Sequence, residues 1–272
     1  RRHIRLKVMQ SLYSYFSNPS NEISISEKEM SKDIRSISDL HIIIISFIIE
    51  LHTYATDFLE ENKTKYIPSK EDLNPNTRFL NNRIITAFKK DELLNKKVSR
   101  ISSIWRKNDL DIIRKVFVEM YKSQQYSDYL NNKKDDFNQD KKFVQIMLNE
   151  YILDNDIFHF ILQEKSIFWT DDLPFISMFL KGQINNMKEN NNNSLVTDVF
   201  KNNDDKKFAV DLFRKTINNA DEFEQLIESK VKNWELERIS KIDLLLIKMA
   251  LTEVISFKEM PIKVSFNEYI EI

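Results

Sequence analysis

Apolar residues recur at helical spacing near the C-terminal end of the sequence, over residues 238–272. The apolar positions of the first helix predicted there are Ile239, Ile242, Leu246, Met249 and Ala250. Ser240 stands where an N-cap is expected, with Asp243 three residues later, which is a capping-box pattern. Pro261 ends this helix because proline lacks an amide hydrogen and restricts the residue before it. A second amphipathic helix is therefore predicted from about Ile262 to the end.

The first 16 residues predict another amphipathic helix, and its first turns are basic. One face carries the apolar side chains of Ile4, Val8, Leu12 and Tyr15, and the opposite face carries His3, Lys7, Gln10 and Ser14. Arg1, Arg2 and Arg5 have no local counter-charge, since the first 21 residues contain no Asp or Glu. Cations at a helix N-terminus oppose the helix dipole. An anionic partner such as RNA or DNA would explain this placement, and an ordinary solvated helix start is the alternative.

The next part of the chain predicts a long helix from about Ser26 to Lys63. Ser26 and Glu29 form a second capping-box pattern, and apolar residues keep helical spacing after them. The richest apolar run, residues 42–49, is far shorter than the roughly 20 residues that a membrane span requires. We therefore expect a buried core helix in a soluble, cytoplasmic protein that has no signal peptide.

Shorter helices follow, joined by polar connectors such as 63–75. They are predicted at 77–90, 91–98, 109–125, 137–153, 156–165, 204–219 and 221–234. Trp169 stands beside Asp171 and Asp172, and paired carboxylates can hold a metal ion or act as acid and base. Thr170, however, is placed to cap a helix whose first turn would hold both acids. We therefore prefer a structural interpretation of this pair.

Composition narrows the chemistry that the chain can perform. With one glycine, the sequence cannot build the usual glycine-rich phosphate loops or tight β-hairpins. With no cysteine, it has no disulfide, thiol nucleophile or Cys-based metal site. The four histidines, which are His3, His41, His52 and His159, are too scattered for a short metal motif. The net charge of −1 does not by itself indicate a nucleic-acid partner. We expect an all-α protein that needs no cofactor or metal and is not an enzyme.

Residues at both ends of the chain resemble those of one family. The C-terminal positions are Ser240, Asp243, Lys248, Ala250, Leu251, Glu253, Pro261, Lys263, Val264, Asn267, Glu268 and Glu271. The N-terminal positions are Arg1, Arg2, Arg5, Val8, Gln10, Leu12, Tyr13 and Ser14. In this order and spacing they resemble the NusB transcription antitermination factor family. His3 departs from the pattern, because many members have another arginine there.

The resemblance covers residues 1–16 and 204–272 and implies one discontinuous NusB-like helical domain. Residues 17–203 would form a large inserted helical region, with an asparagine-rich linker near 185–205. Long members of this kind resemble those of the Bacteroidetes lineage. The family's final helices have no counterpart before Ile272. We therefore expect the C-terminal end of the domain, with part of its RNA-contacting surface, to be missing.

The resemblance implies an RNA-binding antitermination factor. Such proteins pair with NusE, a small-subunit ribosomal protein, bind boxA-type RNA and help RNA polymerase to read through terminators in ribosomal RNA operons. The expected RNA contacts are Arg1, Arg2, His3, Arg5, Gln10 and Tyr13, since arginine suits phosphates and tyrosine stacks on unpaired bases. For Arg5 and Tyr13 a structural role is the alternative, because both lie nearer the apolar side of the helix. The expected NusE interface is Glu235, Glu237, Arg238, Lys241 and Glu253, with a solvated charged face as the alternative.

Two other functions compete with this one. NusB-like domains also occur fused to an rRNA cytosine methyltransferase, but that enzyme needs a glycine-containing cofactor loop and a catalytic cysteine. This sequence supplies neither, so the alternative would require a catalytic domain beyond Ile272. The other alternative is a protein–protein helical scaffold, which would not depend on the N-terminal arginines. A homodimer stays open, since some family members dimerise.

Overall fold

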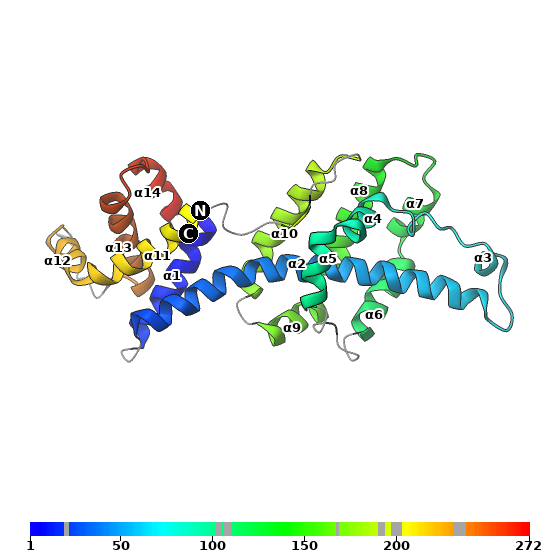
Figure 1. The fold of residues 1–272 in the computed structure, drawn as a ribbon, viewed down its shortest axis with the longest axis horizontal. Helices are drawn as coiled ribbons and strands as arrows, with labels where there is room; N and C mark the ends of the chain where they lie inside the picture. The colour runs from blue at the N-terminus through cyan, green and yellow to red at the C-terminus, as the bar shows by residue number, and fades with distance from the viewer. Residues whose placement is uncertain are drawn as a thin grey trace. The chain divides into compact units, whose positions relative to one another are not determined.

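The computed structural model describes residues 1–18, 22–101, 105, 110–166, 169–189, 194–196, 203–230 and 238–272. Helices account for all of the regular secondary structure in these ranges (Figure 1), which confirms the all-α fold class. Within the same ranges, no helix combines the length and the apolar character needed to cross a membrane.

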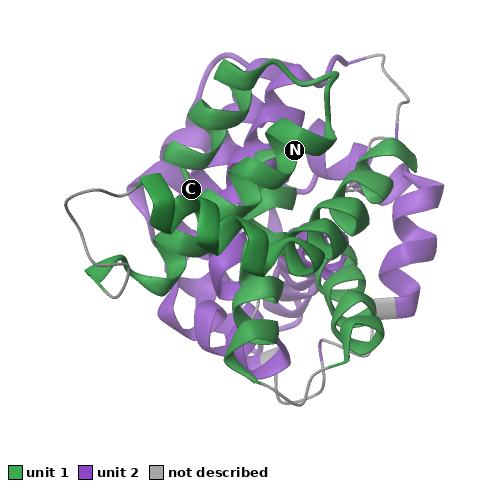
Figure 2. Ribbon diagram, turned by 90° about the vertical axis from the view of Figure 1, so that its left-hand side faces the viewer, with its two compact units in different colours: residues 1–35, 198–272 green, residues 36–197 purple. Residues whose placement is uncertain are grey.

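The chain forms two compact units (Figure 2). Unit 1 consists of Arg1–Arg35 and Asp198–Ile272, so it contains both ends of the chain. Unit 2 consists of Ser36–Thr197. The division falls within the long helix α2 (Ile23–Lys63).

Unit 1 is a helical bundle around one apolar core. Besides the start of α2, it contains α1 (Arg2–Ser17), α11 (Asn203–Asn218), α12 (Ala220–Lys230), α13 (Lys241–Ser256) and α14 (Ile262–Ile270). Helix α1 packs against α11 and α13, and α13 also packs against α12 and α14. The predicted stripe of α1 enters the core, where Val8 and Leu12 meet Leu212, Phe213 and Met249. The first helix of the sequence is thus held by its last helices.

The N-cap and the two helices predicted in the C-terminal segment are confirmed. The Ser240 hydroxyl accepts a hydrogen bond from the amide of Asp243 at 3.1 Å, as expected of an N-cap. Helix α13 ends at Ser256, and α14 begins directly after Pro261. Helices α11 and α12 occupy most of the predicted 204–219 and 221–234. The predicted residues beyond Lys230 lie outside the described part of the chain.

Unit 2 surrounds the remainder of α2. Its helices are α3 (Lys70–Leu73), α4 (Arg83–Lys90), α5 (Glu92–Ile101), α6 (Leu110–Tyr121), α7 (Gln124–Asn131), α8 (Phe137–Ile146), the π-helix Met147–Leu153, α9 (Asp156–Lys165) and α10 (Trp169–Asn186). Helix α8 packs against α4, α7 and α10. Side chains of the apolar run 42–49 are almost all buried, which confirms its prediction as a core helix.

Several predicted boundaries are wrong, and side-chain caps explain two of them. Helix α2 begins at Ile23, so Ser26 lies inside it and is buried. Helix α4 begins only at Arg83, because the Asn82 side chain caps it by accepting hydrogen bonds from the backbone amides of Ile84 and Ile85. Ser123 caps α7 and divides the helix predicted at 109–125. Thr170 lies within α10, since that helix begins at Trp169.

Candidate nucleic-acid interface

The basic first turns of α1 are neutralised by acids from distant helices. Arg1 Nε donates to Asp205 Oδ1 of α11 at 2.8 Å. Arg2 donates to both carboxylate oxygens of Glu268 in α14, at 3.0 and 3.2 Å, and lies 3.6 Å from Glu271. The acids that are absent from the first 21 residues therefore come from the other end of the chain. These ion pairs resolve the unfavourable dipole placement within the molecule.

Arg5 belongs to a buried network. Its guanidinium donates to both oxygens of Glu253 in α13, at 2.7 and 2.8 Å, and it also reaches Glu268 at 3.3 Å. Glu253 accepts two further hydrogen bonds from α14, from Ser265 at 2.7 Å and from the Tyr269 hydroxyl at 2.9 Å. Arg5 therefore joins α1 to α13, and Glu253 joins α13 to α14.

This network fixes the protonation of its members. Burial alone would raise the pKa of Glu253, but the hydrogen bonds from Arg5 and Ser265 outweigh it and lower the pKa. Burial, followed by the neighbouring Glu253 carboxylate, raises the pKa of Tyr269, so the phenol stays a neutral donor. Glu253 is consequently a carboxylate that accepts hydrogen bonds on both of its oxygens, as a buried charge requires.

Two residues that were expected to contact RNA or NusE at the surface are buried. The side chain of Arg5 is 1% exposed and that of Glu253 is 0% exposed, so neither is available to RNA or to NusE. Lys7, expected on the polar face of α1, is buried as well. The reason is that α1 packs against both α11 and α13, while Met30 and Ile34 of α2 join the same core. The buried side of α1 is therefore wider than one stripe.

Other predicted RNA contacts lie at the surface of unit 1. Arg1, Arg2 and Tyr13 are exposed, and His3 and Gln10 are half-buried. Arg2 and Tyr13 are 11 positions apart, which is about three helical turns, so they lie on the same side of α1. An arginine and a tyrosine on one exposed face can contact a phosphate and an unpaired base.

The predicted NusE interface is only partly described. Arg238 and Lys241 are exposed at the start of α13, and Glu253 is buried in the network above. Glu235 and Glu237 lie outside the described residues. Among the residues that are described, no group of His, Asp or Glu is placed to hold a metal ion.

Sequence reasoning missed the acids that complete this region. Asp205 and Glu268 bind the arginines of α1, although neither was expected to act there. One signal was available, because three arginines without local acids in an almost neutral chain require counter-charges elsewhere. The separation of more than 200 residues hid which acids those are.

The described residues of unit 1 form an all-helical bundle. Acids of α11, α13 and α14 pair with the arginines at its N-terminal end. Residues 176–272 match the model of the NusB family. The C-terminal part of the chain is therefore similar to the NusB family, which confirms for this part the resemblance seen in the sequence.

Individual relatives agree with the family match. A protein of Salinibacter ruber named transcription antitermination protein NusB is 48% identical over 65 residues, which are 24% of this chain and 41% of that protein. A protein of the same name from Desulfatibacillum aliphaticivorans is 41% identical over 66 residues, which are 24% of this chain and 46% of that protein. The chain thus spans less than half the length of these relatives. No solved structure matches it.

Proposed function

We propose that this protein is a non-enzymatic, RNA-binding transcription antitermination factor. It would pair with NusE, bind boxA-type single-stranded RNA and act with RNA polymerase in the transcription of ribosomal RNA operons. The observation that carries the proposal is the match of residues 176–272 to the NusB family, together with relatives named as antitermination proteins.

We also propose that the NusB-like domain is discontinuous, with residues 1–16 and 204–272 as its parts. Support comes from unit 1, in which both ends of the chain pack around one core. The family match begins earlier, at residue 176, and so includes part of unit 2. The remaining helices of unit 2 would be the inserted region.

The RNA-contacting residues that the geometry favours are Arg1, Arg2, His3 and Tyr13. Their side chains lie on or near the exposed side of α1. Arg2 presents a planar guanidinium that can exchange Glu268 for a phosphate, and Tyr13 can stack on a base. Arg5 acts indirectly, because its bonds to Glu253 and Glu268 hold α1 in place. Arg238 and Lys241 are the exposed residues that we assign to NusE.

The test is binding of the full chain to a boxA-type single-stranded RNA, with and without NusE, over a range of salt concentrations. We expect tighter binding with NusE and a loss of affinity as salt rises, because bound phosphates release counterions. Arg2→Ala should reduce the slope of log affinity against log salt by about 0.7 for one lost phosphate contact. Tyr13→Leu should weaken binding by about 1–3 kcal/mol without changing that slope.

Arg214→Ala is the matched control. Arg214 in α11 is 57% exposed and pairs with Glu27, much as Arg2 is 52% exposed and pairs with Glu268. Its loss removes the same charge from unit 1 but should leave the salt slope unchanged. Equal slopes for the Arg2 and Arg214 variants would refute the role of Arg2. No RNA binding with folded NusE present would refute the proposed function.

A further inference from the structure

Helix α10 carries two apolar stripes. The first stripe is buried and includes Trp169, Leu173, Ile176, Leu180 and Ile184. The second contains Phe175, Met178 and Phe179, at spacings that place them on a different side of the helix. Met178 is 67% exposed. Phe179 packs edge-on against His41 with ring centroids 5.6 Å apart and stacks on Phe175 at 6.4 Å, while Met178 stays exposed beside them.

The only glycine of the whole sequence lies in this second stripe. Gly182 is in the interior of α10, where glycine is less favourable than alanine. Its φ is not positive, and a Cβ atom built on it would meet no described residue within 4 Å. Neither backbone conformation nor internal packing therefore requires glycine here. What it does provide is open space above the helix backbone, into which another chain can approach closely.

Gly182 lies in a groove of about 440 Å³, lined on one side by Phe175, Met178 and Phe179. Two polar side chains of the groove are bonded within the protein, whereas Asn186 is exposed to solvent. Gln183 accepts a hydrogen bond from His41 Nε2 at 2.6 Å and donates to the Leu195 carbonyl at 3.1 Å. Ser194 donates to Asp91 at 2.8 Å. What remains for recognition is mainly apolar, which suits protein side chains better than the edges of nucleobases.

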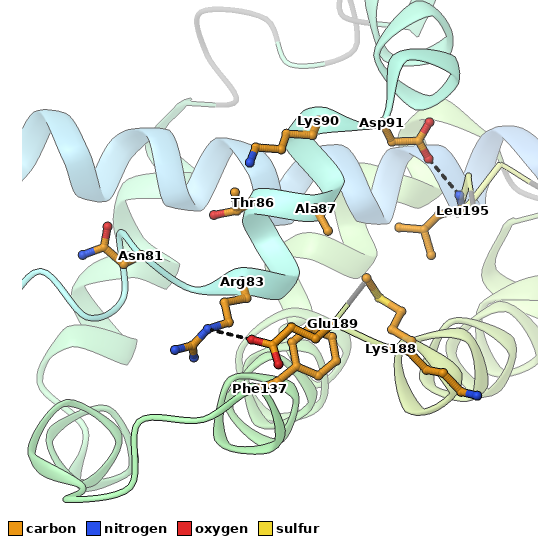
Figure 3. A pocket seen from close by; sticks show the side chains of 11 residues that line it. Asn81, Arg83, Thr86, Ala87, Lys90, Asp91, Phe137, Lys188, Glu189 and Leu195 are labelled. Atoms are coloured by element: carbon orange, nitrogen blue, oxygen red, sulfur yellow. Dashed lines mark hydrogen bonds and ion pairs between the residues drawn. The ribbon is translucent and has the colours of Figure 1, made fainter. Parts of the chain in front are cut away.

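A second pocket, of about 550 Å³, adjoins the groove and shares Met187 and Leu195 with it (Figure 3). Arg83 is held there by Asp140 at 2.9 Å, by Asp135 at 3.1 Å and by Glu189 at 3.4 Å. Asp91 likewise accepts the Leu195 amide at 2.8 Å. These charges are therefore satisfied inside the protein.

Two lysines also line this pocket, and their ammonium groups point away from each other (Figure 3). They are Lys90 at the end of α4 and Lys188 after α10. Over the part of the chain that the structure describes, neither lysine has an acidic partner within 4.0 Å. Within the described residues, the pocket beside the apolar groove thus carries two lysines without an acidic partner.

We propose that the groove on α10 is the docking site for an acidic amphipathic helix of a partner protein. Apolar side chains of that helix would enter between Phe175, Met178 and Phe179, and its backbone would pass closest at Gly182. Flexible methionine suits such a contact because it adapts to the side chains that it meets. Acidic side chains of the partner would pair with Lys90 and Lys188. This inference is independent of the RNA-binding function.

The test uses the full chain and two labelled amphipathic peptides with identical apolar faces, one rich in glutamate and the other rich in lysine. Fluorescence anisotropy should show that the acidic peptide binds and that the basic one does not. Gly182→Leu fills the open space and should weaken acidic-peptide binding by about tenfold or more, while the fold is retained. Lys90→Glu with Lys188→Glu should reverse the preference between the peptides.

Glu119→Leu is the control, because it adds a leucine to an exposed position of α6 in the same unit. It should leave peptide binding unchanged, and thermal unfolding should show that Gly182→Leu is as well folded as this control. Equal binding of both peptides, or no effect of Gly182→Leu, would overturn the proposal. Self-association of the chain that Gly182→Leu abolishes would identify a second copy as the occupant, and Gly182-dependent RNA binding would identify RNA. Either result would also overturn it.

Discussion

At the scale of single residues, the Arg5–Glu253 pair is a buried ion pair that joins two helices of unit 1. Removing one member of a buried ion pair leaves the other charged and desolvated, at a typical cost of about 3–5 kcal/mol. Glu253→Gln should therefore lower the free energy of unfolding by about 3 kcal/mol, at the low end because Glu268 also contacts Arg5. Urea denaturation at neutral pH measures this change.

Arg214→Ala again supplies the comparison, because the Arg214–Glu27 pair is largely exposed. Exposed pairs contribute roughly 0–1 kcal/mol, so this variant should lose little. If Glu253→Gln were as stable as Arg214→Ala, the Arg5–Glu253 pair would not be a buried anchor of unit 1.

The same pair should also make the stability of the protein depend on pH in the acid range. Because the pKa of Glu253 is lowered on folding, its contribution is present above the unfolded value of 4.5 and is lost as pH falls below it.

His41 in unit 2 predicts a second pH effect. Its imidazole is 2% exposed, and burial is the main reason that its pKa falls from 6.5 to about 4. The unfolded chain therefore takes up this proton at a higher pH than the folded chain. Stability should fall as pH decreases from 6.5 toward 4, by about 2 kcal/mol between pH 7.5 and pH 5.

The measurement is the free energy of unfolding of the native protein and of His41→Gln across this pH range. Glutamine does not titrate but can still donate to Gln183, so the variant should lose most of the His41-dependent slope. His52 also has a pKa lowered by burial and contributes in the same direction in both proteins. Parallel pH profiles for the two proteins would contradict the assignment to His41.

At the scale of helices, the sequence predicted most elements because their signals are local. Ser240 caps the start of α13, Pro261 stands directly before α14, and the apolar run of α2 marks a buried helix. Errors arose where two local signals competed. Ser26 and Glu29 look like a capping box, but α2 already begins three residues earlier. Asn82 and Ser123 cap helices inside segments whose apolar period runs on without interruption.

The roles of the arginines could not be predicted from local signals. Periodicity places Arg5 between the apolar and polar sides of α1, and that position fits a surface contact or a buried one. Only the packing of α1 against α13 shows that Glu253, 248 positions away, faces it. The resemblance to the family indicated which segments of the chain form the candidate site. Which charged residues pair with each other could be seen only in the folded structure.

At the scale of the whole molecule, the RNA-contacting side of α1 belongs to unit 1 and the α10 groove belongs to unit 2. We expect the two activities to separate by mutation. Arg2→Ala should weaken RNA binding and leave binding of the acidic peptide unaffected. Gly182→Leu should weaken binding of the acidic peptide and leave RNA binding unaffected.

Any coupling between two binding sites must act equally in both directions. Saturating the groove with peptide and repeating the RNA titration measures that coupling directly. A peptide that changes RNA affinity, while RNA changes peptide affinity by the same factor, would replace two independent sites by one linked system.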